Sequence, residues 1–359
     1  MLLNLSNIKT GGGIQVSLSF MDYLNKSEFK FEKILITKKL LAEIKKNKTD
    51  FKKGNIVVTK NLFHKIWFLT FHRQKVVFTL FGPTYGFKLK DVTWVNGFAQ
   101  PWILFPKNIV YKELNILKKI FFKFKFFIQK QLFKKCDFLV VEHEFIKKEL
   151  RDRIVKNSKI KVANNAINQI FLDKSSWKKI KIRKSNKIKI GMIGRNYLHK
   201  NFSIALKVKK ELLDRFKLKT EFYATLNSSE LKSLNKSFSK HINCIGQLSL
   251  RECPDFYNKM DVIFFPSNLE CFSATPIESV FMGKKLVSAD YSFNKYLDSQ
   301  LISFFTPNDH VSAAETLFTI ISETKTNNLN HEKEKILREF NAFKRFKSIL
   351  TLLSEFKTH

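Results

Sequence analysis

Two glutamates, Glu270 and Glu278, bracket the stretch ECFSATPIE, which follows an apolar run at 262–265 that predicts a buried strand. Thr275, Pro276 and Glu278 fit the start of a helix, as N-cap, favoured first helical residue and capping-box glutamate. Glu270 has no such local role, because it lies in the loop near the carboxyl end of the strand, where ligands bind in open α/β sheets. Carboxylates at that edge would accept hydrogen bonds from the hydroxyls of a ribose and a sugar.

Basic residues follow a second predicted strand in the stretch IGMIGRNYLHKNF, residues 190–202. Gly194 turns the chain there, and Arg195 and Lys200 lie at the entrance to a predicted helix. Guanidinium and ammonium groups beside a helix N-terminus suit a diphosphate, because they neutralise the charge that builds on a leaving group. A solvated basic turn is the alternative for either residue alone. The backbone amides of CFSA, residues 271–274, offer a second place for phosphate or sugar oxygens.

A third stretch, GGGIQVSLSF at residues 11–20, joins the first predicted strand to a helix. Its glycines permit positive φ and a close approach of the backbone to a ligand, and the helix start offers N–H groups to an anion. A glycine turn between a strand and a helix is common, and the spacing departs from the GxGxxG fingerprint. The sequence therefore gives no support to a dinucleotide site.

Short apolar runs alternate with longer amphipathic segments along the chain, which is typical of a parallel sheet covered by helices on both faces. We expect strands at 2–5, 76–81, 138–141, 188–193, 222–224, 262–265 and 285–288, with helices in most of the gaps. The Lys-rich stretch LDKSSWKKIKIRKSNK separates two halves that each repeat the pattern. The expected organisation is a first domain at 1–171, a linker at 172–186, a second domain at 187–329 and a helical tail at 330–359.

The chain is strongly basic, with 65 Lys and Arg against 31 Asp and Glu and a formal net charge of +34. Such a surface attracts phosphate-rich partners, which include nucleic acid, anionic membranes and nucleotide substrates; coding bias is the alternative source of so many lysines. The four cysteines form no CxxC pair, so the sequence indicates neither a disulfide framework nor a zinc site. Neither a signal peptide nor a spanning helix is recognisable, and we expect a soluble or peripheral protein.

One predicted helix, at residues 114–135, has more apolar surface than a single buried face requires. One stripe of the helix comprises Leu117, Phe121, Phe124, Ile128 and Leu132. Three further aromatic residues lie off this stripe: Phe122, Phe126 and Phe133. A helix in which lysines alternate with these rings suits docking on anionic lipid. An ordinary buried helix whose lysines reach outward is the alternative.

The stretches TGGGIQVSLSF, GRNYLHKN and PSNLECFSATPIES, in this order and spacing, resemble the retaining glycosyltransferases of family 4, particularly those of bacterial surface-polysaccharide and O-antigen clusters. The resemblance covers most of the chain, and the segment VANNAINQIF is similar to the one that precedes the interdomain linker. It implies the GT-B fold, an α/β architecture of two Rossmann-like domains facing across a cleft. The implied reaction is transfer of a hexose, with retention of anomeric configuration, from a nucleotide diphosphate sugar to a hydroxyl of a lipid-linked saccharide.

The resemblance also implies roles for individual residues. Arg195 and Lys200 would bind the donor diphosphate and, with Glu270 on the transferred sugar, form the catalytic set. Glu278 would bind the ribose. The remaining donor-binding residues would be Phe272, Ser273 and Ala274 at the sugar and phosphate, Gly13 at the diphosphate from the other domain, and Gly246 and Leu248 beside the base.

The first domain departs from the family pattern. Many relatives place a histidine there near the sugar, whereas this chain has FGPTYG at residues 81–86 and His72 lies too far back to replace it. The catalytic role of any first-domain side chain is therefore open. No DxD motif is present, which fits a diphosphate stabilised by side chains and a helix dipole, with no metal ion or other cofactor.

The expected partners are a nucleotide sugar, a lipid-linked saccharide acceptor and an anionic membrane surface contacted through residues 114–135. They would place the protein in the cytoplasm, on the inner face of the cell membrane. A nucleic-acid-binding protein is the alternative from another class, motivated by the net charge and the interleaved Lys and Phe of residues 117–135, but it leaves the glycine turns and the paired glutamates unexplained. A GT-B sugar-nucleotide epimerase is the alternative among enzymes.

Overall fold

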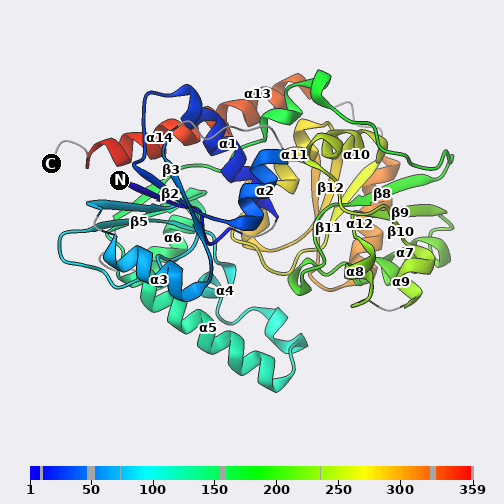
Figure 1. Cartoon of the computed structure of the whole chain (residues 1–359). Coiled ribbons are helices and arrows are strands. Elements are labelled where there is room, and N and C mark those ends of the chain that lie inside the picture. The colour runs from blue at the N-terminus through cyan, green and yellow to red at the C-terminus, as the bar shows by residue number, and fades with distance from the viewer. Residues whose placement is uncertain are drawn as a thin grey trace. The chain divides into compact units, whose positions relative to one another are not determined.

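The structure is a computed structural model, which describes residues 1–8, 11–46, 53–72, 74–153, 159–234, 236–323 and 329–356 (Figure 1). The chain divides into two compact units. The first comprises residues 1–107, 111–168 and 340–359, and the second comprises residues 108–110 and 169–339. Each unit contains one parallel sheet with its own buried core, as the alternation of apolar runs and amphipathic segments predicts.

The first unit is built on a seven-stranded parallel sheet with the order β3-β2-β1-β4-β5-β6-β7. Its strands are β1 (Leu2–Asn4), β2 (Lys33–Thr37), β3 (Asn55–Thr59), β4 (Val76–Thr79), β5 (Thr93–Phe98), β6 (Phe138–Val141) and β7 (Lys159–Val162). The interior strands are rich in Val, Ile, Leu and Phe because helices bury both of their faces.

The helices of the first unit are α1 (Gly12–Lys26), α2 (Lys38–Lys46), α3 (Leu62–Phe71), α4 (Pro101–Leu104), the 3-10 helix η1 (Ile109–Glu113, whose first two residues are assigned to the second unit), α5 (Ile116–Lys134), α6 (Glu144–Arg153) and α14 (Ala342–Ser354). Although α14 lies at the end of the chain, it packs on α1, with 5.3 Å between the ring centroids of Phe20 and Phe346. The last helix therefore completes the core of the first unit.

The second unit contains a six-stranded parallel sheet with the order β10-β9-β8-β11-β12-β13. Its strands are β8 (Ile188–Met192), β9 (Thr220–Ala224), β10 (Asn243–Cys244), β11 (Val262–Phe265), β12 (Lys285–Ala289) and β13 (Ile302–Phe305). The chain runs from β8 to β9 and β10 on one side and then returns to β11 on the other side of β8. Strands β8 and β11 therefore form the topological switch point of this sheet.

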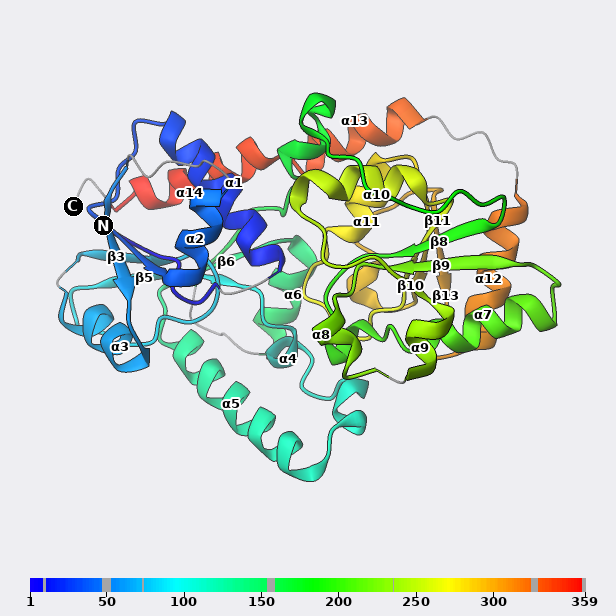
Figure 2. The same ribbon diagram turned by 45° about the vertical axis from the view of Figure 1, so that its right-hand side comes forward.

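The helices of the second unit are η2 (Gln169–Phe171), η3 (Lys174–Ser176), η4 (Leu198–Lys200), α7 (Ile204–Asp214), α8 (Ser228–Leu231), α9 (Lys236–His241), η5 (Leu250–Glu252), α10 (Cys253–Lys259), α11 (Thr275–Phe281), η6 (Ser292–Asn294), α12 (His310–Ser322) and α13 (Leu329–Glu339). Helices α7 and α12 pack against each other on one face of the sheet, and α10 and α11 cover the opposite face (Figure 2). The core on the α7 side includes Ile190, Val208, Phe222, Phe264 and Leu317.

All seven strands expected from the sequence are present, with ends that differ by up to two residues. Six further strands were not expected: β2, β3, β5, β7, β10 and β13. The expected linker, residues 172–186, lies within the second unit, where the Ile180 N–H donates to Asp255 Oδ2 at 2.7 Å. The expected tail is divided, because α13 belongs to the second unit and α14 to the first.

Helix α5 packs on the first unit through a face that differs from its expected stripe. Phe126 stacks on Trp102 of α4 with 5.4 Å between ring centroids, and Phe133 lies 4.9 Å from Phe98 of β5. Both phenylalanines are buried. The expected stripe is exposed at Leu117, Phe121, Phe124 and Ile128. The buried face is the off-stripe one because the aromatic rings of α4 and β5 are available there as partners.

Candidate functional site

The two stretches that carry the predicted chemistry of the second unit follow adjacent strands. The stretch with Arg195 and Lys200 comes after β8, and the stretch with Glu270 comes after β11, its hydrogen-bonded neighbour. Because the strands are parallel, both stretches begin at the carboxyl ends of neighbouring strands, at the switch point. The fold thus brings together residues about 75 positions apart in the chain.

Lys200 and Glu270 form a buried ion pair. The Lys200 Nζ lies 2.5 Å from Glu270 Oε1, and the Ser267 hydroxyl donates to the same oxygen at 2.6 Å. Glu270 is 8% exposed, so its charge is held by these two donors rather than by bulk water. The Lys200 ammonium also lies 5.1 Å from the centre of the Phe265 ring. A lysine ammonium has three donors, so one ion pair leaves donors that could bind an anionic ligand.

The loops after β8 and β11 are fastened to each other through His199. Its carbonyl oxygen accepts the Asn268 N–H at 2.7 Å and lies 3.2 Å from Oγ of Ser267, whose one hydroxyl hydrogen is donated to the closer Glu270 oxygen. Burial lowers the pKa of the His199 imidazole to about 4, so this ring is neutral near pH 7 and adds no charge beside Lys200. The hydrogen bonds fix the position of Lys200 relative to Glu270.

Glu278 has a different partner from the one that the sequence predicts. Helix α11 begins at Thr275, its N-cap is Ala274, and no side chain caps it, so the capping-box interpretation of Thr275 and Glu278 is wrong. The Glu278 carboxylate instead accepts the hydroxyl of Tyr257, from α10, at 2.7 Å. The orientation of the Glu278 side chain is therefore set by its buried partner in α10 and not by the backbone at the start of α11.

The buried Glu278 carboxyl is also electrostatically perturbed. Burial raises its pKa to about 7, against the opposing influences of the Tyr257 hydroxyl and the nearby Lys200 charge. Lys200, which pairs with Glu270, is thus the cation that acts on the Glu278 carboxyl. A carboxyl that titrates near neutrality at a switch point is typical of a functional site.

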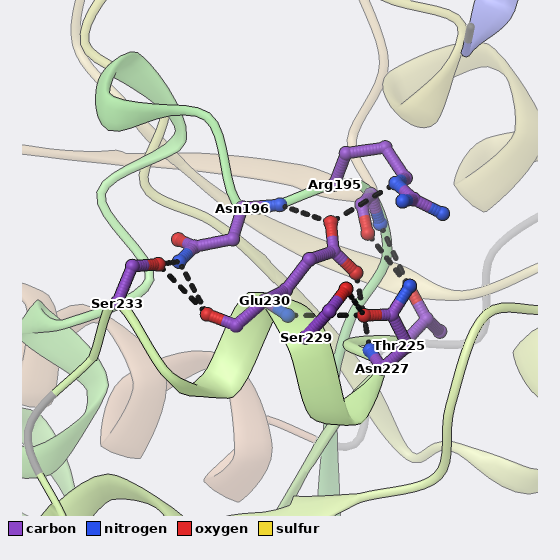
Figure 3. A network of polar contacts seen from close by, with 8 residues as sticks. Arg195, Asn196, Thr225, Asn227, Ser229, Glu230 and Ser233 are labelled. Carbon is purple, nitrogen blue, oxygen red and sulfur yellow. Dashed lines mark hydrogen bonds and ion pairs between the residues drawn. The ribbon is translucent and has the colours of Figure 1, made fainter.

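Arg195 is held by an acidic residue to which the sequence analysis assigned no role. Its Nε lies 2.9 Å from Oε1 of Glu230 in α8, and the Asn196 N–H donates to the same oxygen at 2.9 Å (Figure 3). The other carboxylate oxygen accepts the Asn227 N–H at 3.1 Å, as part of a capping box. Glu230 therefore fixes the start of α8 and the Arg195 side chain together, and an arginine bound through Nε can present its terminal nitrogens to an anion.

The segment before α11 is anchored by an aromatic residue from the loop after β12. The Tyr296 hydroxyl donates to the Ser273 carbonyl oxygen at 2.5 Å, and the Tyr296 ring centroid lies 4.3 Å from that of Phe272. Ala274 follows as the N-cap of α11. These contacts determine the path of residues 272–274 directly after Glu270.

The other predicted donor-binding residues lie on separate segments. Gly246 follows β10 with a φ of +85°, and a Cβ there would meet no atom within 4 Å. Leu248 is half-buried in the same loop. Gly13 lies in the first turn of α1 in the first unit, where an added Cβ would approach Ile8 Cγ2 at 3.4 Å.

The first-unit residues considered for the missing histidine also have defined surroundings. His72 follows α3 and contacts the Lys33 side chain. In the loop 81–86, Gly82 has a φ of +86° and Tyr85 accepts a hydrogen bond from Gln129 of α5 at 2.7 Å. Within the ranges that the structure describes, no group of three His, Cys, Asp or Glu side chains is placed to hold a metal ion.

The sequence and the fold have known counterparts. Residues 173–335 match the family model described as "Glycosyl transferases group 1". No curated protein matches the sequence. The fold is similar to that of a glycosyltransferase from Rickettsia africae, at 15% identity, a TM-score of 0.69, and coverage of 99% of this chain and 97% of the other.

Two further solved structures are similar over almost their whole length. Sucrose-phosphate synthase from Thermosynechococcus elongatus has 10% identity and a TM-score of 0.73, with 99% of this chain and 98% of the other covered. Anabaena HepE in complex with UDP-glucose has 12% identity and a TM-score of 0.70, with 99% of each chain covered. The expected GT-B fold, with two Rossmann-like units, is confirmed. The matching family model spans the whole second-unit cluster.

Proposed function

We propose that this protein transfers a hexose from a nucleotide diphosphate sugar to a hydroxyl group of an acceptor, with retention of anomeric configuration. The observation that carries the proposal is the cluster of Lys200, Glu270 and Glu278 at the switch point between β8 and β11. This cluster joins one cation to two carboxyl groups within the segment that matches the group 1 glycosyltransferases. A diphosphate needs cations, and a sugar and a ribose need acceptors for their hydroxyls.

The chemical step breaks the bond between the anomeric carbon and the diphosphate, so negative charge develops on the departing phosphate oxygen. Lys200 and Arg195 would stabilise that charge, as would the backbone N–H groups of Phe272, Ser273 and Ala274. Glu270 would orient the transferred sugar through its hydroxyls, and Glu278 would bind the ribose. Gly246, Leu248 and Gly13 complete the proposed donor-binding set.

The cationic side chains supply the stabilisation that a bound metal ion supplies in other transferases, so we propose a reaction without a metal ion or cofactor. HepE, which has a similar fold, binds UDP-glucose. A UDP-hexose is therefore the first donor to test.

The proposed acceptor is a lipid-linked saccharide on the inner face of the cell membrane, within surface-polysaccharide or O-antigen synthesis. Two features support an acceptor at a lipid surface: the apolar side chains that α5 exposes and the lysines between them. None of the helices in the described part of the chain is long and apolar enough to cross a membrane. Contact with lipid would therefore be made by a surface of the protein.

A screen of nucleotide sugars by thermal shift tests the proposed donor class. A donor should raise the melting temperature, because it binds only the native state, and sugar should then be released or transferred on incubation. A matched set of UDP-glucose, glucose and UMP separates recognition of the whole donor from recognition of its parts. If no nucleotide sugar shifts the melting temperature or is consumed, the proposal fails; conversion of the donor sugar without an acceptor would indicate an epimerase.

The pKa of Glu278 predicts a pH-dependent affinity for the donor. With a pKa of about 7, the carboxyl becomes ionised as the pH rises from about 6 to about 8, and the ionised form is the stronger acceptor because both of its oxygens are free of a proton. Affinity for UDP-glucose should therefore rise over this range, and it should stay flat in Glu278→Gln. Calorimetric titration of both proteins measures it, and equal pH profiles would contradict a ribose contact.

The same pKa predicts the opposite trend for stability. The folded protein holds a proton on Glu278 that the unfolded chain, with its ordinary carboxyl pKa, has lost. The contribution of Glu278 to the free energy of unfolding should therefore fall as pH rises between about 4.5 and about 7. A comparison of unfolding in Glu278→Gln separates this structural contribution from the change in donor affinity.

A further inference from the structure

Helix α3 and helix α5 both expose large apolar side chains on the first unit. On α3, the side chain of Phe63 is 82% exposed, that of Trp67 58% and that of Phe71 65%, at a spacing of four residues along one stripe. The corresponding residues of α5 are Ile116, Leu117, Ile120, Phe121, Phe124, Phe127 and Ile128. Such a concentration on two helices is more than the scattered apolar residues of an ordinary surface.

Both helices are already packed on the first unit through another face. Helix α5 is already anchored by the buried Phe126 and Phe133, and α3 is anchored by the buried Phe68 and Leu69. Both helices also have a side-chain N-cap: Asn61 accepts the His64 N–H at the start of α3, and Asn115 accepts the Lys118 N–H at the start of α5. Each helix thus has a satisfied inner face and a second apolar face directed to solvent.

The two helices lie on the same face of the sheet. Helix α3 connects β3 to β4 and α5 connects β5 to β6, and both connections move in the same direction across the strand order. Right-handed crossovers in one direction place their helices on one face of a parallel sheet. Both views of the ribbon agree with this placement (Figures 1 and 2).

Tyr85 connects the two helices. Its ring lies 4.4 Å from Nζ of Lys65 in α3, and its hydroxyl accepts a hydrogen bond from Gln129 of α5 at 2.7 Å. The following residues stay beside α3, because the Phe87 N–H donates to Thr70 Oγ1 at 3.0 Å. The Phe87 side chain is 69% exposed, so the loop adds an aromatic ring next to the α3 stripe.

Charge on these segments has a single sign. Residues 53–90 contain no Asp or Glu, and α5 contains six lysines and no acidic residue. Lys60 and Lys90 flank α3 and the Phe87 loop, whereas Lys88 of the same loop forms an ion pair with Asp137 at 2.5 Å. A surface that combines exposed rings and aliphatic chains with an excess of basic residues is complementary to anionic headgroups over an apolar interior.

We infer that α3, residues 86–90 and α5 form one docking surface for an anionic lipid bilayer. Nucleic acid would use the lysines and the rings, but it offers no apolar phase to Ile116, Leu117 and Ile120. A bilayer can contact the aliphatic, aromatic and basic side chains together. Trp67 and the phenylalanines would lie at headgroup depth, and the lysines would contact the phosphates. The inference extends the surface from α5 to α3, and it holds whether or not the protein transfers a sugar.

Co-sedimentation of the full-length protein with lipid vesicles tests this surface without any nucleotide sugar. The vesicles contain phosphatidylcholine alone or with about one third phosphatidylglycerol. The wild-type protein should bind the anionic vesicles more tightly by at least about tenfold. Trp67 provides a second readout: its fluorescence should shift to the blue on binding. Trp67→Phe should lose most of that shift, because Trp94 and Trp102 are buried and the half-buried Trp177 belongs to the second unit.

Paired substitutions then separate the two helices. Phe63→Ser with Trp67→Ser in α3, and Phe121→Ser with Phe124→Ser in α5, should each weaken vesicle binding by about tenfold or more. Leu213→Ser in α7 of the second unit, where the side chain is 46% exposed, is the matched control and should bind as the wild type does. Because all five side chains are exposed, melting temperatures should change little.

Several results would overturn the inference. Wild-type affinity in the α3 pair would remove α3 from the surface and restrict docking to α5. Equal binding to neutral and anionic vesicles would contradict the role of the lysines. Tight binding of single-stranded DNA with no vesicle binding would assign the surface to nucleic acid, and dimers that the same substitutions dissolve would assign it to a second copy of the chain.

Discussion

Replacing Lys200 by alanine should lower the rate of sugar transfer by about a hundredfold or more. The Lys200 ammonium is placed by two loops that are hydrogen-bonded to each other at the edge of the sheet, and it lies in a buried site where water screens charge poorly. A cation held in this way needs no reorganisation when charge develops on the departing diphosphate. Steady-state kinetics with the donor identified by thermal shift measures the effect, which should appear mainly in kcat.

A lysine of the same unit supplies the control for this experiment. Lys207 is exposed on α7, and Lys207→Ala should leave turnover near that of the wild type. Since Lys200→Ala leaves the buried Glu270 without its cation, the melting temperature of this variant checks that lost activity is not lost folding. Near-normal turnover in a folded Lys200→Ala protein would remove Lys200 from the diphosphate site.

The strands that could be predicted from the sequence are mostly interior strands with uninterrupted apolar runs, such as β6 and β11. All four edge strands, β3, β7, β10 and β13, escaped prediction. An edge strand is covered less completely, so it tolerates polar residues, and the burial of β7 alternates along KIKV. Its partner in the sheet, rather than its own composition, determines that it is a strand.

Two interior strands escaped prediction for more specific reasons. Strand β2 runs into α2 at Lys38 with no turn residue between them, so the sequence offers no boundary. Strand β5 contains Asn96 and Gly97, which are uncommon in strands. Asn96 is accommodated because its Oδ1 accepts the Thr84 hydroxyl at 2.7 Å, and no local pattern in the sequence predicts this contact.

The positions of the candidate residues relative to the strands could be predicted from local order in the sequence. The contacts that they make with distant residues could not. The sequence predicts that Lys200 and Glu270 each follow a strand, and they follow β8 and β11. Their ion pair was not predicted, because it depends on which strands are neighbours in the sheet. Glu278 looks like a helix cap in the sequence, yet Tyr257, 21 positions away, binds its carboxylate. The capping box of Asn227 and Glu230 is visible in the sequence, but the ion pair between Glu230 and Arg195 depends on the tertiary fold.

Replacing Glu270 by glutamine should reduce sugar transfer by about a hundredfold while leaving the affinity for UDP within about threefold of the wild type. Glutamine keeps the size of the side chain and can still accept the Ser267 hydroxyl, but it loses the charge that pairs with Lys200. If Glu270 orients the transferred sugar, a ligand without sugar should not sense the change. Calorimetry with UDP and kinetics with the complete donor separate the two effects.

The alternative is that Glu270 only holds Lys200 in place. In that case Glu270→Gln should weaken UDP binding as much as it slows transfer, because the diphosphate would lose a correctly placed cation. Ser267→Ala removes the other donor to Glu270 and leaves the ion pair intact, so it should cost far less activity under either role. Glu315→Gln, in an exposed ion pair with Arg215, is the matched control and should change neither quantity. Parallel losses of UDP affinity and turnover would therefore make Glu270 a positioning residue, whereas lost turnover with retained UDP affinity places its carboxylate on the sugar.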